Sequence, residues 1–152
     1  MEWETYMTQA LELARQAGAL GEIPVGAVVV KDGAVIGRGF NRRETDHDAT
    51  AHAEVLAIRD ACRTLGGWRL DGCTLFVTLE PCPMCTGAIL QSRLSRVVYG
   101  AADPKAGCCG GLLALTEENF DTHPAIYAGV LEQECAALLR DFFAGRRRAS
   151  EK

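Results

Sequence analysis

Five short runs rich in β-branched and aromatic residues, separated by segments with helical periodicity, restrict what this chain can fold into. Asp32 and Gly33 divide the first two runs, which is typical of a β-hairpin. The later runs alternate with helical segments. That order predicts an α/β domain with a mixed central sheet of about five strands and helices on both faces. The expected strands are residues 24–30, 34–40, 74–79, 96–101 and 125–131.

Apolar residues at helical spacing predict five helices around these strands. Thr50 is expected to cap the second helix, because Thr is a favoured residue at helix N-termini. Pro81 is expected in the first turn of the third helix, where its missing N–H costs nothing. The expected helices cover residues 7–17, 51–65, 81–91, 112–115 and 132–148.

The composition is that of a chain with a substantial core. Hydrophobic residues make up 48% of the 152 positions and charged residues 24%. No internal repeat or linker is evident, so residues 1–152 are expected to form a single domain. No apolar run approaches the ~20 residues of a membrane span, and the acidic N-terminus does not resemble a signal peptide. We therefore expect a cytoplasmic protein without a membrane partner.

The net charge of −4 argues against broad nonspecific binding to nucleic acid, and no DNA partner is expected. One local exception lies at the C-terminus. Residues 140–152 contain four arginines and one lysine against one Asp and one Glu. This segment could contact an anionic partner although the whole chain is acidic.

Two of the seven cysteines, Cys82 and Cys85, follow the expected strand 74–79 closely, and Pro81 and Pro83 flank Cys82. An odd number of cysteines without a secretory signal disfavours a disulfide framework. Positions i and i+3 lie on one face of a helix, so both thiols can point together, and the positive end of the helix dipole would stabilise them as thiolates. The pair fits either a thioredoxin-like redox motif or half of a metal site.

A metal site needs a third ligand, and His52 begins the expected second helix about thirty residues before Cys82. Both halves of the site would then lie at helix N-termini beyond strand ends, a common position for α/β active sites. One imidazole and two thiolates can hold a catalytic zinc and leave one position for water. Glu54 would then accept a proton from that water. A structural zinc would want a fourth protein ligand, and none is evident nearby.

The order His-x-Glu followed by Pro-Cys-x-x-Cys is the signature of zinc deaminases. The stretches PVGAVVV, GRGFN, HDATAHAE, TLEPCPMCTGAI, SRVVYGAADPKAG and ECAALLRDFF extend the likeness from residue 11 to about residue 148. On these residues the chain resembles the bacterial tRNA-specific adenosine deaminases, within the cytidine and deoxycytidylate deaminase-like superfamily. The resemblance implies a three-layer fold, one Zn²⁺ per chain, a homodimer, and deamination of the wobble adenosine in the anticodon stem-loop of an arginine tRNA.

The resemblance also implies roles for single residues. It places zinc on His52, Cys82 and Cys85, proton transfer on Glu54, and substrate contacts on Asn41, Asp103, Phe143 and Arg146. In that family the asparagine contacts the target nucleoside, the aspartate lies near the RNA backbone, and the last helix packs against the anticodon loop. Simpler readings stay open for three of these contacts: Asn41 as a turn residue, Asp103 as a cap before Pro104, and one of Phe142 and Phe143 as core.

Two other functions remain as alternatives. A deaminase of free bases or nucleosides, acting on guanine, cytosine or cytidine, would carry a similar zinc motif but need no RNA contact surface. A noncatalytic zinc-binding subunit is disfavoured by Glu54, because such subunits often lose the carboxylate. Cys108 and Cys109 stand where small residues are usual in the family, and we interpret both as small side chains in a tight loop.

Overall fold

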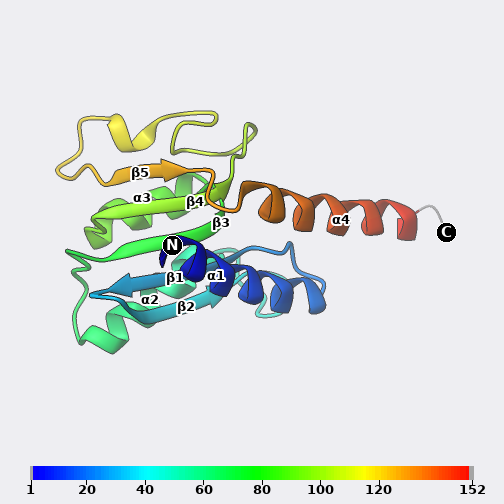
Figure 1. Ribbon diagram of the computed structural model, residues 1–152, viewed down its shortest axis with the longest axis horizontal. Helices are drawn as coiled ribbons and strands as arrows, with labels where there is room; N and C mark the ends of the chain where they lie inside the picture. The colour runs from blue at the N-terminus through cyan, green and yellow to red at the C-terminus, as the bar shows by residue number, and fades with distance from the viewer. Residues whose placement is uncertain (1, 151–152) are drawn as a thin grey trace.

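A five-stranded sheet with the order β2-β1-β3-β4-β5 forms the middle layer of the molecule (Figure 1). The structure, a computed structural model, describes residues 2–150. β1 pairs antiparallel with β2 and with β3, whereas β3, β4 and β5 are parallel. The mixed sheet predicted from the sequence is therefore confirmed. The strands are β1 (Gly26–Lys31), β2 (Ala34–Phe40), β3 (Thr74–Leu79), β4 (Arg96–Ala101) and β5 (Ala125–Ala128).

Helices cover both faces of this sheet, as the alternating pattern predicts. The first face carries α1 (Glu2–Ala19) and the first turns of α4 (Glu132–Ser150), and the second carries α2 (Ala53–Leu65) and α3 (Pro83–Ser92). Side chains alternate between the two faces along each strand. Phe76 packs in the core beneath α1, while its neighbours Leu75 and Val77 pack in the core beneath α2 and α3. Within residues 2–150, no helix has the length and apolar character needed to cross a membrane.

Two of the differences between the expected and the observed helices have a local cause in the sequence. α3 begins at Pro83 and not at Pro81, because a residue that precedes proline is pushed out of the helical region, and Cys82 is indeed extended (φ −76°, ψ 177°). The short helix expected at residues 112–115 is a single 3₁₀ turn at Leu115–Glu117. Gly110 and Gly111 precede it and have low helix propensity, which favours a tight loop over a regular helix.

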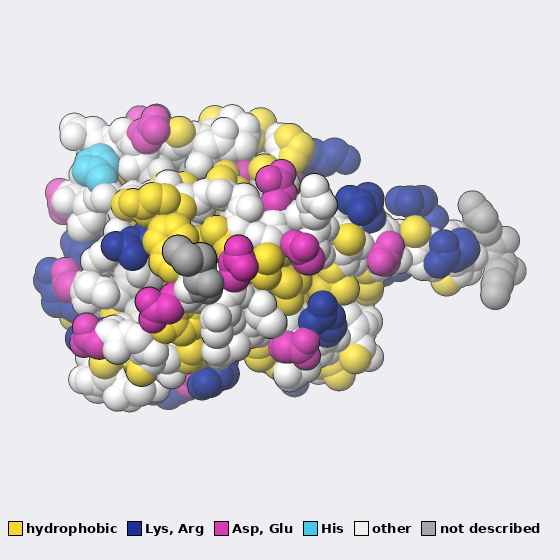
Figure 2. Space-filling model, viewed as in Figure 1, with side chains coloured by type: hydrophobic (Ala, Val, Ile, Leu, Met, Phe, Trp, Pro, Cys, Tyr) yellow, Lys and Arg dark blue, Asp and Glu magenta, His cyan; other side chains and the backbone are white. Residues whose placement is uncertain are grey.

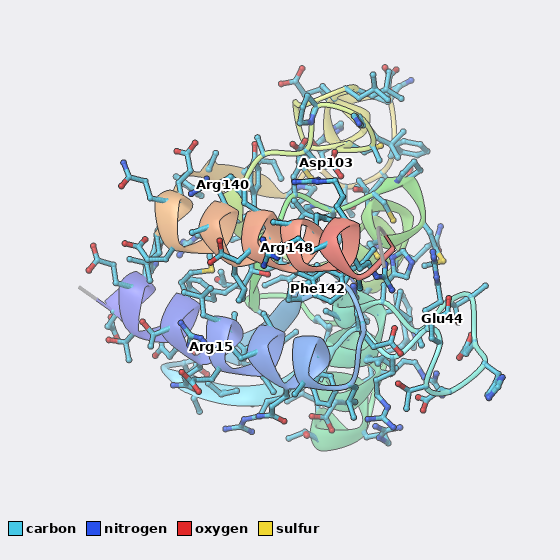
Figure 3. All side chains as sticks on the ribbon, turned by 90° about the vertical axis from the view of Figure 1, so that its right-hand side faces the viewer. Arg15, Glu44, Asp103, Arg140, Phe142 and Arg148 are labelled. Atoms are coloured by element: carbon cyan, nitrogen blue, oxygen red, sulfur yellow. The ribbon has the colours of Figure 1, made fainter. Side chains whose placement is uncertain are left out.

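The sheet topology brings four chain segments to one edge of the molecule. Because β2 and β3 both run antiparallel to β1, the ends of β2, β3 and β4 lie at the same edge, and β1 begins there. The segment before β1 and the loops after β2, β3 and β4 therefore converge. This edge is on the right in Figure 1 and faces the viewer in Figure 3. Open α/β sheets bind ligands beyond the carboxyl ends of their strands.

Close packing of α2 on β2 depends on glycine at the contact. A β-carbon added at Gly39 would lie 2.4 Å from the carbonyl oxygen of Ala53 and 2.6 Å from the amide nitrogen of Ala57. We expect Gly39→Ala to lower the free energy of unfolding by about 1–3 kcal/mol, because the helix must move away from the strand. Denaturant unfolding measures this change. Gly67→Ala is the control, since nothing lies within 4 Å of its added carbon, and an equal loss in both variants would contradict the packing argument.

Candidate active site

Two helix N-termini meet at the edge where the four segments converge. His52 is the residue immediately before α2, Cys82 immediately precedes α3, and Cys85 lies in the first turn of α3. The Nδ1 atom of His52 lies 3.6 Å from the Sγ of Cys82 and 3.4 Å from the Sγ of Cys85. The structure thus brings together three residues that are separated by a helix, a loop and a strand in the sequence.

These three residues fit a metal ion by their chemistry and their spacing. Their ligand atoms all lie within 4.8 Å of one another, and no other group of His, Cys, Asp or Glu in residues 2–150 meets that condition. Two sulfurs and one imidazole nitrogen are donors that zinc prefers. Three protein ligands leave a fourth tetrahedral position for a water or a substrate atom, as in catalytic zinc sites.

The protonation of the three groups already favours a thiolate. The thiol of Cys85 donates a hydrogen bond that lowers the pKa of Cys82 to about 4, and the interaction with His52 acts in the same direction against burial. The same hydrogen bond, together with burial, raises the pKa of Cys85. The bond with Cys82 raises the pKa of His52 although burial opposes it. Since a coordinating thiol is deprotonated outright, binding a cation here would release protons.

Glu54 adds a carboxyl group suited to proton transfer. Its side chain is only 4% exposed, and burial, followed by the nearby charge of Cys82, raises the pKa of Glu54 to about 7. A group whose pKa lies near the working pH can both accept and return a proton. Glu54 and two of the three metal-binding candidates, His52 and Cys82, line the same pocket.

This pocket holds about 230 Å³ and is built from all four converging segments. That volume lies below the roughly 300–1,000 Å³ of sites for drug-sized ligands, so the pocket suits a small group. Of the predicted substrate contacts, three line it and Phe143 does not. The pocket-lining residues are Gly21, Glu22, Ile23, Val25, Asn41, Arg43, Glu44, His52, Glu54, Leu79, Glu80, Cys82, Asp103, Ala106 and Arg146.

Asn41 has a structural role that the sequence did not reveal. Its side-chain oxygen accepts a hydrogen bond from the amide of Ala53 at 2.8 Å, and its side-chain nitrogen donates to the carbonyl of Ile23 at 3.1 Å. Asn41 therefore caps α2 from a neighbouring loop. The expectation that Thr50 caps this helix is wrong, because His52 occupies the cap position and the Thr50 hydroxyl donates to Asp48 at 2.8 Å.

Asp103 follows β4, where it stabilises a turn and also borders the pocket. Its Oδ1 atom accepts hydrogen bonds from the amides of Lys105 at 3.0 Å and Ala106 at 3.2 Å, which is the turn-stabilising role. It also lines the pocket. Figure 3 shows Asp103 and Glu44 on different sides of this edge, one in the loop after β4 and the other in the loop after β2. Cys108 and Cys109 are buried in the Asp103 loop, as small side chains there would be.

Two buried carboxylates of the pocket wall were missed from the sequence. Glu22 accepts hydrogen bonds from the amides of Glu44 at 3.2 Å and Thr45 at 2.6 Å and from the Thr45 hydroxyl at 2.6 Å. Burial alone would raise the pKa of Glu22, but the bonds from Thr45 and Glu44 outweigh it and lower the pKa. The second is Glu80, directly after β3. For both Glu22 and Glu80, the only signal in the sequence was an acidic residue beside an apolar strand.

The C-terminal helix reaches from the body of the molecule past this edge (Figure 1). Arg146 donates to the carbonyl of Gly21 at 3.3 Å and lies over the ring of Phe142, 4.9 Å from its centre. Phe142 is half-buried, whereas Phe143 is 37% exposed. Figure 2 shows Lys and Arg side chains gathered over this projecting helix.

Comparison with known proteins agrees with this geometry. The family described as the cytidine and deoxycytidylate deaminase zinc-binding region matches residues 1–101. The tRNA-specific adenosine deaminase of Bacillus subtilis is 52% identical over 141 residues, which cover 92% of this chain and 88% of that protein. The chain belongs to the tRNA-specific adenosine deaminases of the cytidine deaminase superfamily. A segment of the Deinococcus radiodurans tRNA(Ile)-lysidine synthase is also 50% identical, but this chain spans only 25% of that protein.

Solved structures place this deaminase in the same superfamily. One of them comes from work on A-to-I editing by tRNA:A34 deaminases at the wobble position of transfer RNA. It is 46% identical to this chain with a TM-score of 0.84, and the match covers 89% of this chain and 99% of that one. Another is a guanine deaminase from Nitrosomonas europaea, 28% identical with a TM-score of 0.75, covering 93% of this chain and 84% of that one. The three-layer deaminase fold expected from the sequence is therefore confirmed.

Removal of one candidate ligand tests the metal site in this deaminase. We expect Cys85→Ala to lower the bound zinc from about one ion per chain to a small fraction, because two ligands hold zinc far more weakly than three. Elemental analysis of the purified protein measures the ratio. Cys73→Ala removes an equally buried thiol outside the site and should keep its zinc. Full zinc in Cys85→Ala would show that the metal is held elsewhere.

Proposed function

We propose that this enzyme deaminates the wobble adenosine in the anticodon loop of an arginine tRNA. The reaction consumes water and yields inosine and ammonia. The observation that carries the proposal is the meeting of His52, Cys82 and Cys85 beside the buried carboxyl of Glu54 in one pocket. A chain so similar to tRNA-specific adenosine deaminases over nearly its whole length is expected to share their substrate class.

The chemistry divides between the metal site and Glu54. A zinc ion held by His52, Cys82 and Cys85 would supply Lewis acidity, which makes water a nucleophile at neutral pH. Glu54 accepts a proton from the attacking water and delivers it to N1 of adenine. After the water oxygen has bonded to C6, Glu54 accepts the second proton of that water from the new hydroxyl and passes it to the amine. The C6–N bond then breaks, and ammonia leaves. The raised pKa of Glu54 suits this repeated exchange, because neither protonation state is strongly favoured near neutral pH.

The pocket suits a single base taken out of its stack. Anticodon loops present bases that can splay outward at little cost, and enzymes acting on a base require this exposure. Ile23, Val25 and Leu79 supply apolar lining, while Arg43 and Arg146 supply positive charge for the phosphates on either side of the base. The side-chain amide of Asn41 can form further hydrogen bonds beyond those to Ile23 and Ala53, and we expect one of these to contact the nucleoside.

The projecting part of α4 supplies the second RNA contact in this proposal. Arg146 and Arg148 are exposed on it, and so is the ring of Phe143, which can stack on a base. Asp103 borders the pocket on the other side and is expected near the RNA backbone. These local features explain how a protein of net charge −4 can bind a polyanion.

The assembly and location are part of the same proposal. We expect a homodimer, supported by the exposed apolar side chains of Met84 on α3 and of Leu112 and Leu113 on the loop beside it, which a second chain could cover. We expect zinc as the resident metal, from the donor set and the family. A cytoplasmic location follows from a tRNA substrate.

The function is tested by offering the enzyme several substrates. Transcribed arginine tRNA, adenosine, guanine and cytosine are incubated separately, and ammonia and inosine are measured. We expect inosine in the tRNA and little ammonia from the free compounds. Turnover of guanine without inosine in tRNA would favour the free-base deaminase alternative, which the structural likeness to a 28% identical guanine deaminase supports. No turnover of any substrate by zinc-loaded protein would favour the noncatalytic alternative.

Glu54→Gln tests the proton carrier. Gln has the shape of Glu but cannot take up or return the proton, so we expect kcat to fall by roughly 10²–10⁴-fold, the usual contribution of general acid–base catalysis. Zinc content should remain about one per chain, because Glu54 is not among the three ligand candidates. Turnover close to that of the unaltered enzyme would refute the role.

Arg146→Gln tests the basic helix. We expect weaker binding of an anticodon stem-loop and a shallower dependence of affinity on salt, by roughly 0.7 in the log–log slope for one lost phosphate contact to a single-stranded loop. Arg69→Gln is the matched control, since Arg69 pairs with Asp71 on the exposed loop before β3 and lies outside the pocket. An unchanged salt slope in Arg146→Gln would count against RNA contact by this arginine.

A further inference from the structure

Glu80 is a buried carboxylate that accepts hydrogen bonds from the backbone amides of one distant loop. Its side chain is only 2% exposed, and it lies two residues before Cys82. Its Oε1 atom accepts the amide of Asp103 at 2.9 Å, and its Oε2 atom accepts the amides of Cys109 at 2.9 Å and Gly111 at 2.7 Å. Three charge-assisted bonds from a single side chain therefore span residues 103–111.

The loop is shaped to receive this carboxylate. A β-carbon added at Gly107 would lie 2.3–2.5 Å from the carboxyl atoms of Glu80, and one added at Gly111 would lie 2.3 Å from Oε1. Only glycine permits so close an approach of backbone to carboxylate. The carbonyl of Pro81, the next residue, also accepts the amide of Cys108 at 2.9 Å. The strand that leads to the metal-binding cysteines thus carries the anchor of the loop.

We propose that Glu80 is a positioning residue that fixes residues 103–111, and Asp103 with them, as one wall of the pocket at a set distance from the metal-binding cysteines. The inference rests on the proposed function, since the wall would orient the target nucleotide. Glu80 and Asp103 both line the pocket, and the amide of Asp103 is bound directly by Glu80. Hydrogen bonds to a buried charged acceptor are about twice as strong as neutral ones, which makes this wall rigid.

Rigidity of the wall matters because catalysis depends on the placement of the reacting base. A misplacement of about 1 Å can cost roughly 100-fold in rate. Glu80→Gln keeps the size of the side chain but replaces one oxygen by an NH₂ group that cannot accept. At least one of the three amides then loses its acceptor. The loop is expected to loosen on the Asp103 side or on the Cys109 and Gly111 side, while the three metal ligands are unaltered.

The test combines amide exchange with kinetics on zinc-loaded protein. In Glu80→Gln we expect the hydrogen-exchange rate of at least one of the amides of Asp103, Cys109 and Gly111 to rise by about tenfold or more. The zinc content should stay near one ion per chain. The value of kcat/KM on an anticodon stem-loop should fall by roughly 10–100-fold. Gly111→Ala approaches the same contact from the loop side and should give the same pattern. Gly67→Ala, with open space around its added carbon, should change none of these values.

A double variant separates positioning from general destabilisation. If Glu80 and Gly111 act through one contact, Glu80→Gln combined with Gly111→Ala should lower kcat/KM by little more than either change alone. Multiplied losses, unchanged exchange at all three amides, or unchanged kcat/KM despite faster exchange would each overturn the inference. If the unaltered enzyme forms no inosine in the stem-loop, the proposed function fails, whereas the exchange measurement still tests the anchoring by Glu80.

Discussion

The approach of two helix N-termini at one edge of the sheet is the constraint on which the rest of this structure depends. α2 brings His52 and Glu54 to that edge, and α3 brings Cys82 and Cys85. The partial positive charge at the start of α3 favours a thiolate at Cys82. Antiparallel pairing of β1 with both neighbours makes this meeting possible, because it places the ends of β2 and β3 at the same edge of the sheet, on either side of the start of β1.

The loops around this edge are held by side chains that do no chemistry themselves. Asn41 ties the loop after β2 to the start of α2, and Glu22 binds two further amides of the same loop. Glu80 does the same for the loop after β4. Each anchor joins segments far apart in the sequence, and each lines the pocket. Hydrogen bonds to backbone amides thus shape the pocket together with its apolar lining.

The sequence predicted the layers, the strand order along the chain and the meeting of His52 with the cysteine pair, because periodicity and rare ligand types are local signals. It did not predict what depends on distant backbone. Thr50 was the expected cap, but the amide of Ala53 is satisfied by Asn41 from another loop. Glu80 resembled an ordinary acidic residue after a strand, since its partners lie more than twenty positions away. The start of α3 could have been predicted better, because a residue before proline leaves the helical region, which excludes Cys82 from the helix.

The most direct test of the account is X-ray absorption at the zinc edge of the purified protein. The account predicts two sulfur neighbours at about 2.3 Å, one imidazole nitrogen at about 2.0–2.1 Å and one further light atom. This is the set that His52, Cys82 and Cys85 would provide with one open position. A shell of four sulfurs, or one with no sulfur, would contradict it.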